Sequence, residues 1–147
     1  MKKIKLKVIT PERLILEEIV DQVSLPTTEG EITVLPDHIP LIANLASGDI
    51  VAVSGNESIP MAVAGGFVEI KKEEDGMTTV AILADFAEHV MDLSDEAVEK
   101  ARERAVELKK KINNKETVDF EYFSAELEKS LVRVKVADKW RKKKYRK

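Results

Sequence analysis

The hydrophobic pattern of residues 3–87 has a period of two and is interrupted at short intervals by turn residues. Ile4, Leu6 and Val8 alternate with lysines, which is typical of a strand with one buried face. The turn sequence Ser-Gly-Asn at 54–56 separates apolar runs at 49–53 and 58–63, and this arrangement predicts a β-hairpin. Many short strands with regularly spaced turns predict a β-sandwich or barrel.

A glycine pair, Gly65-Gly66, follows this hairpin and is expected to break the chain. Two more strands, 67–70 and 77–83, are expected to flank a turn at 71–76. The pair has neither a helix start nor a lysine to receive a phosphate. It therefore predicts a turn or a close backbone approach and no nucleotide loop.

After Met91 the apolar spacing changes to three and four residues, which predicts a first helix. Ser94 or Asp92 is expected to cap its start, and Asn113-Asn114 to end it. Its apolar stripe consists mostly of small residues: Val98, Ala101, Ala105, Leu108 and Ile112. This stripe allows close helix packing but buries little area, so the helix is expected to dock weakly.

A second helix is predicted to start at Thr117 or Asp119. Its expected stripe spans three turns or more: Phe120, Phe123 or Ser124, Leu127, Leu131 and Val134. Residues 131–136 also alternate, so a strand is an alternative there, although the surrounding helix formers favour a helix. Two amphipathic helices with a short connection predict an antiparallel hairpin.

Composition narrows the classes of function. Hydrophobic residues make up 44% and charged residues 35% of the 147 residues, with a net charge of -3, so the chain as a whole is not a nucleic-acid binder by charge. It has no cysteine, which excludes disulfides, thiolate nucleophiles and zinc–thiolate or iron–sulfur sites. We expect neither a secretory signal nor a membrane-spanning helix, and hence a cytoplasmic protein.

No pattern of catalytic or metal-binding residues is recognisable. The two histidines, His38 and His89, lie in dissimilar contexts, and the run of carboxylates at 73–75 is typical of a solvated turn. We therefore expect no catalytic residue, no cofactor and no metal site.

Residues 29–42, EGEITVLPDHIPLI, form the most distinctive segment. Pro36 and Pro40 lack the backbone donor that a central strand needs, and both fix their φ angles. The segment is thus predicted to be a rigid, partly apolar loop. It is either a stiff corner of the sandwich or a docking surface.

This segment resembles a signature of the epsilon subunit family of the F-type (rotary) ATP synthase. The resemblance extends in order over nearly the whole chain and includes VITPE at 8–12, LASGDI at 45–50, VAGGFV at 63–68 and YFSAEL at 122–127. Thr33 and Asp37 stand where the family has glycine. Asp37 can keep a turn with positive φ, whereas Thr33 indicates extended backbone.

The resemblance implies a mainly β plus α fold, with a flattened β-sandwich at 1–88 and an antiparallel two-helix hairpin with a basic tail at 89–147. It also implies a non-catalytic rotor subunit of the central stalk that couples proton-driven rotation to ATP synthesis. The expected partners are the gamma subunit, the membrane rotor c-ring, and the alpha and beta subunits. The ring contacts implied for the loop are Glu31, Asp37 and His38. The expected location is peripheral, on the cytoplasmic face of the bacterial plasma membrane.

In relatives the hairpin either folds onto the sandwich or extends along gamma into the catalytic head, where it inhibits ATP hydrolysis. A small energy gap between docked and undocked states suits such an element. Our hypothesis is that a basic cluster pairs with an acidic turn of the beta subunit in the extended state. Its residues are Arg133, Lys135, Lys139, Arg141, Lys142 and Lys143. The alternative is a solvated, frayed tail.

Some relatives bind ATP through a motif at the start of the first helix. The corresponding stretch here is 94–99, in which only Asp95 remains, while Val98 and Glu99 replace an arginine and an alanine. Losing the cation and adding a carboxylate weakens polyphosphate binding, so we expect none. Two rival functions are a homodimeric sandwich module and an RNA-binding protein that uses the basic tail with its aromatics.

Overall fold

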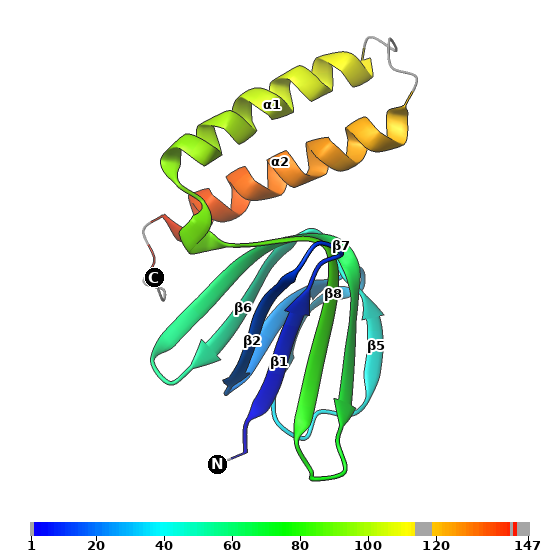
Figure 1. The fold of residues 1–147 in the computed structure, drawn as a ribbon, viewed down its shortest axis with the longest axis vertical. Helices are drawn as coiled ribbons and strands as arrows, with labels where there is room; N and C mark the ends of the chain where they lie inside the picture. The colour runs from blue at the N-terminus through cyan, green and yellow to red at the C-terminus, as the bar shows by residue number, and fades with distance from the viewer. Residues whose placement is uncertain (1, 114–118, 142, 144–147) are drawn as a thin grey trace.

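The computed structural model describes residues 2–113, 119–141 and 143. Eight strands form the N-terminal part, and two helices lie beyond the end of the sheet that is farthest from the N-terminus (Figure 1). The strands are β1 Ile4–Ile9, β2 Leu14–Val20, β3 Gln22–Thr27, β4 Gly30–Val34, β5 Leu41–Asn44, β6 Gly48–Ser54, β7 Glu57–Lys72 and β8 Thr78–His89. A short 3-10 turn, η1 Val90–Asp92, leads to α1 Asp95–Asn113 and α2 Phe120–Trp140.

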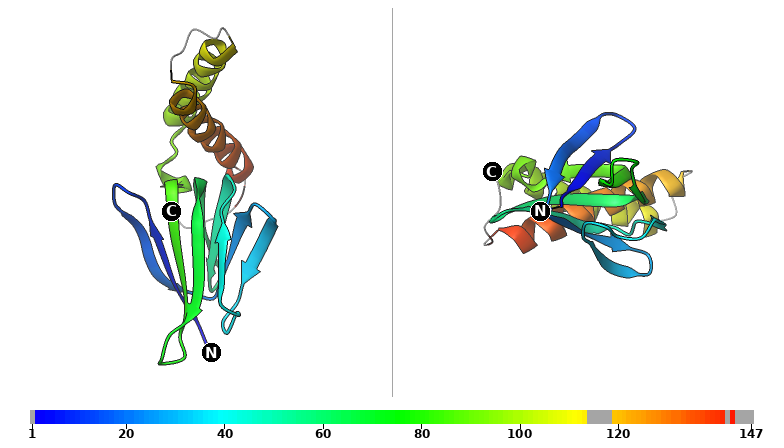
Figure 2. Two further views of the ribbon diagram at one scale, coloured as in Figure 1. Left: turned by 90° about the vertical axis from the view of Figure 1, so that its right-hand side faces the viewer. Right: turned by 90° about the horizontal axis from the view of Figure 1, so that it is seen from below.

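The strands form one folded sheet in the order β2-β1-β8-β7-β6-β3-β4, with β5 also paired to β7. The first half of β7 pairs with β6 and the second half with β5, in one continuous antiparallel register. The two halves belong to different layers, which are seen side by side in Figure 2. The predicted β-sandwich is thus confirmed.

The expected break at Gly65-Gly66 was wrong, because β7 runs through both glycines. They have φ angles of 73° and 110°, a region that side-chain-bearing residues rarely adopt. A Cβ on Gly66 would lie 2.2 Å from the Leu83 carbonyl oxygen. The pair therefore bends the strand between the two layers, close to β8, without ending it.

The core between the layers consists of large aliphatic side chains that exclude solvent. Alternate residues of β1 supply Ile4, Leu6 and Val8, as the sequence predicts. Strands β7 and β8 add Val68, Ile70 and Ile82 to the same cluster. The period of two thus fixes which face of each strand is buried.

The helix boundaries follow the predicted caps. The Ser94 hydroxyl accepts a hydrogen bond from the Ala97 amide at 3.1 Å, and the Asp119 carboxylate accepts one from the Tyr122 amide at 3.0 Å. α1 ends at Asn113, whereas Asn114 and Thr117 lie outside the described residues. The helices pack against each other along their length, which confirms the predicted hairpin.

The buried face of α1 agrees with the prediction, but that of α2 does not. On α1, Val98, Ala101, Ala105 and Leu108 are buried as expected. On α2 the buried residues are Ser130, Val132, Val136 and Trp140, while Phe120 and Leu131 are exposed. The predicted stripe was wrong because α2 has a second packing partner, the sheet, besides α1.

Residues 131–136 are helical, so the strand alternative is excluded. Their alternating pattern has another origin, since Val132 and Val136 pack on the sheet one helical turn apart. They cluster with Ala62 and Ala64 of β7, and Val51 of β6 and Phe86 of β8 pack against the same cluster.

Candidate interaction surfaces

The loop between β4 and β5 is held in a defined conformation. Asp37 has a φ of 69°, which confirms that it supports the turn that glycine would otherwise make. Its backbone amide donates to the Thr78 hydroxyl at 2.7 Å, and its carboxylate pairs with Lys2 at 2.7 Å and Lys72 at 3.0 Å. Hydrogen bonds from Lys2 and then Lys72 lower the pKa of Asp37 below its usual value. The loop is thus tied to the N-terminal end of β1 and to the β7–β8 turn.

The same loop presents apolar side chains to solvent. Ile39 is 73% exposed and Leu35 is 52% exposed, beside the prolines Pro36 and Pro40. The His38 amide donates to the Leu35 carbonyl at 3.1 Å, which closes the turn. A stiffened loop with exposed aliphatic residues fits a docking surface better than a simple corner.

Glu31 does not join Asp37 and His38 in this loop. It lies on β4 opposite Pro26 of β3, near the start of the strand. Leu35, where the loop begins, lies four positions after Glu31, which corresponds to about 13 Å of extended chain. The structure therefore brings together two of the three predicted ring contacts.

A row of exposed apolar side chains crosses the outer face of the sheet and was missed in the sequence. Phe67 of β7 lies opposite Leu83 of β8, Leu83 lies opposite Ile9 of β1, and Ile9 lies opposite Leu14 of β2. Leu14, Phe67 and Leu83 are 48%, 46% and 39% exposed. We call these four residues the outer-face row. The strand pairing alone makes them neighbours, so no local sequence signal could have found it.

A second surface is the contact between α2 and the sandwich, which is centred on Asp49 of β6. One carboxylate oxygen, Oδ2, accepts hydrogen bonds from Lys139 Nζ at 2.8 Å and from the Trp140 indole N–H at 2.9 Å. Burial alone would raise the pKa of Asp49. The hydrogen bonds from Lys139 and Trp140 and the Lys139 charge outweigh burial, so this pKa lies below its usual value.

Arg133 makes a further contact between α2 and the sandwich. Its Nε lies 2.8 Å from Glu88 Oε2, and its guanidinium lies 4.8 Å from the centre of the Phe86 ring. Glu128, more than a turn earlier on α2, accepts a hydrogen bond from Ser47. Two cations of the predicted basic cluster, Arg133 and Lys139, are thus paired with carboxylates of the sandwich.

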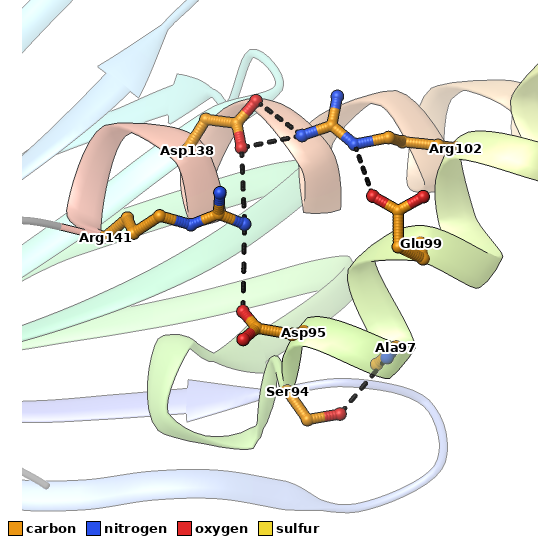
Figure 3. A network of polar contacts seen from close by, with 7 residues as sticks. All are labelled: Ser94, Asp95, Ala97, Glu99, Arg102, Asp138 and Arg141. Carbon is orange, nitrogen blue, oxygen red and sulfur yellow. Dashed lines mark hydrogen bonds and ion pairs between the residues drawn. The ribbon is translucent and has the colours of Figure 1, made fainter.

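Arg141 belongs to a network that joins the two helices (Figure 3). It pairs with Asp95 at 3.7 Å and with Asp138 at 4.0 Å. Asp138 also accepts from Arg102 of α1 at 2.8 Å, and Arg102 pairs with Glu99 at 3.3 Å. Asp95 therefore faces the arginine that directly follows α2 in this arrangement.

The remaining cations of the predicted cluster differ in their surroundings. Lys143 lies 5.2 Å from the centre of the Trp140 ring, and Lys142 lies outside the described residues. Lys135 is exposed and forms no ion pair with any residue that the structure describes.

Residues 2–113, 119–141 and 143 contain neither a metal-binding cluster nor a membrane-spanning helix. No group of three or more histidine, aspartate or glutamate side chains there could hold a metal ion. Neither described helix is long and apolar enough to cross a membrane.

Comparison with known proteins gives consistent matches. Residues 3–90 match the family model described as ATP synthase, Delta/Epsilon chain, beta-sandwich domain. The chain is similar to the ATP synthase epsilon chain of Nitratidesulfovibrio vulgaris (strain DP4), with 36% identity over 135 residues that cover 92% of this chain and 96% of the relative. It is also 36% identical to that of Dehalococcoides mccartyi (strain CBDB1) over 144 residues, which cover 97% of each chain.

Two solved structures share the fold. A chain in the cryo-EM structure of the Euglena gracilis mitochondrial ATP synthase (OSCP/F1/c-ring) matches with a TM-score of 0.68 and 23% identity, covering 87% of this chain and 77% of that one. A chain in the central stalk/c-ring structure of the Tetrahymena thermophila mitochondrial ATP synthase matches with a TM-score of 0.55 and 17% identity, covering 95% and 98%.

Proposed function

Because the chain belongs to the family of ATP synthase epsilon chains, we propose that it is a non-catalytic subunit of the central stalk. In this role it turns with the gamma subunit and the membrane rotor ring, and couples proton-driven rotation to ATP synthesis in the catalytic head. It is peripheral and lies at the cytoplasmic face of a bacterial membrane, held there through its partners.

The observation that carries this proposal is the outer-face row. Aliphatic and aromatic side chains on four strands form a continuous strip, in which Leu14, Phe67 and Leu83 are exposed and Ile9 is half-buried, on the face of the sheet opposite the core. Such a strip is typical of a surface that a protein partner covers. We assign the gamma subunit as that partner, since a stalk subunit must be held firmly enough to transmit torque.

The loop at 35–40 is the proposed ring contact, with Asp37 and His38 as its polar members and Ile39 as its apolar one. Its ion pairs to Lys2 and Lys72 stiffen it, and a stiff contact transmits torque with little elastic loss. Glu31 lies too far along β4 to share this contact. We therefore assign Glu31 to a separate point on the ring.

The hairpin supplies the proposed regulation. In the docked arrangement seen here, Arg133 and Lys139 are paired with the sandwich and Arg141 with the hairpin itself. To inhibit ATP hydrolysis, α2 has to leave the sandwich and present these cations, with Lys135, Lys142 and Lys143, to the acidic turn of the beta subunit. Charge pairing in that partly desolvated site then holds the extended state.

Binding to purified gamma subunit tests the coupling role. The full chain is titrated with gamma and the affinity is measured by calorimetry. Phe67→Ser and Leu83→Ser each remove an exposed member of the outer-face row, and we expect each to weaken binding about tenfold or more. Val106→Ser on α1 is the matched control, because Val106 is also an exposed aliphatic residue and lies outside the sandwich.

The proposal is supported if the wild-type chain and the Val106→Ser control bind gamma and both sandwich variants do not. Absence of a complex with the wild-type chain, or equal binding by all variants, would contradict it.

A further inference from the structure

We propose that Asp49 anchors a charge latch that holds the helical hairpin on the sandwich, and that an acidic partner opens it by competing for the same cations. The latch consists of Asp49 with Lys139 and Trp140, and of Glu88 with Arg133. The inference rests on the proposed function only for the identity of the acidic partner.

The apolar part of the contact is small. The buried strand residues in it are Ala62 and Ala64, which cluster with Val132, Val136 and Trp140 of α2, while Val51 and Phe86 of the sandwich are only partly buried against them. A buried methyl group removes far less apolar surface from water than a leucine side chain, and stabilisation scales with that area. The two alanines therefore contribute little to docking, and the contacts with charged side chains add to the packing of Val132, Val136 and Trp140.

Asp49 makes the directional polar contacts between the sandwich and α2. Its side chain is only 16% exposed, and both of its donors come from α2. A hydrogen bond to a charged group contributes more than a neutral one, and a half-buried carboxylate that loses its partners must be rehydrated. The docked position of α2 is therefore tied to this one side chain in addition to the apolar packing.

The second pair fixes the orientation of the helix. Arg133 precedes Lys139 by six residues, which corresponds to about 9 Å along the helix axis. Glu88 is 20% exposed and lies on β8, while Asp49 lies on β6, so the two carboxylates hold α2 across three strands. Two separated anchors prevent the helix from rolling on its small apolar face.

Docking and binding to an acidic partner exclude each other, because they use the same side chains. While α2 is docked, Lys139 and Arg133 face carboxylates of the sandwich. Lys135 projects to solvent between them in sequence and has no ion pair among the described residues, so it is available for first contact with an acidic surface. Transfer of Arg133 and Lys139 to that surface then releases the hairpin.

The test measures docking in the isolated full-length chain. The chain has no cysteine, so Asn56→Cys in the β6–β7 turn and Val106→Cys on α1 can carry two spin labels without competing sites. The distance distribution between them reports docked and undocked hairpins. We expect Asp49→Asn to raise the undocked-to-docked ratio about tenfold, because it removes the charge that two donors share.

Glu73→Gln is the matched control. It removes one carboxylate charge from the β7–β8 turn, where Glu73 pairs with Lys71 at 3.6 Å, at the end of the sandwich away from the helices (Figure 1). It should leave the distance distribution unchanged. Lys139→Gln should resemble Asp49→Asn, and the double variant should add little, because both changes break one interaction.

Lys139 is exposed enough that its substitution leaves the sandwich fold intact, so it gives the same test if Asp49→Asn unfolds the chain. Unchanged distances in both variants would overturn the latch. The gamma-binding test would be unaffected by that result, and a loss of gamma binding would equally leave the distance measurement standing.

Discussion

The sandwich and the hairpin are held together by different kinds of contact. Inside the sandwich, Leu6, Val68 and Ile82 lie in a core of large aliphatic residues that are closed to solvent. Between the hairpin and the sandwich, the alanines of β7 face Val132, Val136 and Trp140 of α2, and charged side chains at the rim make further contacts. The first arrangement gives a permanent unit, and the second gives one that can be detached without unfolding its support. The proposed coupling role requires the former, and the proposed regulation requires the latter.

The largest expected effect lies in the sandwich core. Ile82→Ala removes a fully buried side chain from β8 and should lower the free energy of unfolding by about 2–5 kcal/mol, through lost burial and the cavity left behind. Chemical denaturation followed by circular dichroism in the β region measures it. A loss below 0.5 kcal/mol, as is usual for surface sites, would show that Ile82 does not belong to a tightly packed core.

A smaller effect is expected where α2 lies on the sheet. Ala62→Leu should destabilise docking by about 1–3 kcal/mol, because the larger side chain cannot fit beneath Val132 and Val136. Trp140 is the single tryptophan and is buried in this contact, so its fluorescence and its quenching by acrylamide report docking. The denaturation midpoint of the sandwich should hardly change. If Ala62→Leu weakened docking and also lowered the denaturation midpoint of the sandwich, the two regions would not be independent in stability.

Breaking one rim contact should cost less. Arg133→Gln removes the pair with Glu88 and the contact with Phe86, and should weaken docking by about 1 kcal/mol after allowance for solvent screening. Arg104→Gln on α1 is the control, since its partner Glu107 lies on the same helix. Trp140 quenching should increase in the first variant and stay at the wild-type level in the second.

The smallest effect is a dependence of docking on pH. Because the folded state lowers the pKa of Asp49, its stabilisation of docking is complete above the ordinary aspartate pKa of about 4 and is lost as pH falls through the lower folded-state value. Trp140 quenching should therefore rise in the acid range below about pH 4. The Asp49→Asn variant should lack this dependence, and an equal acid response in that variant would assign it to another group.

Local features of the fold could be read from the sequence. The alternation of Ile4, Leu6 and Val8, the turn at 54–56, and the caps Ser94 and Asp119 depend on neighbours within a few residues. The sequence motifs also showed the resemblance to the epsilon subunit family, on which the proposed function rests.

Features that depend on distant partners could not be read in this way. The Gly65-Gly66 pair predicts a break in the strand, but β7 pairs with β8 both before and after the two glycines and so continues through them. The buried face of α2 is decided by the sheet below it, and no local periodicity reveals that second partner. Asp49 and Trp140 are 91 residues apart, so their contact exists only in the folded chain.

We expect the hairpin to open while the sandwich stays folded. Native-state hydrogen exchange of the full chain, followed by mass spectrometry, tests it most directly, because exchange reports the free energy of each local opening. We predict that α2 amides exchange at a markedly lower opening free energy than those of β7 and β8, and that Asp49→Asn accelerates only the helices. Exchange of helices and strands together, at one common free energy in both proteins, would contradict it.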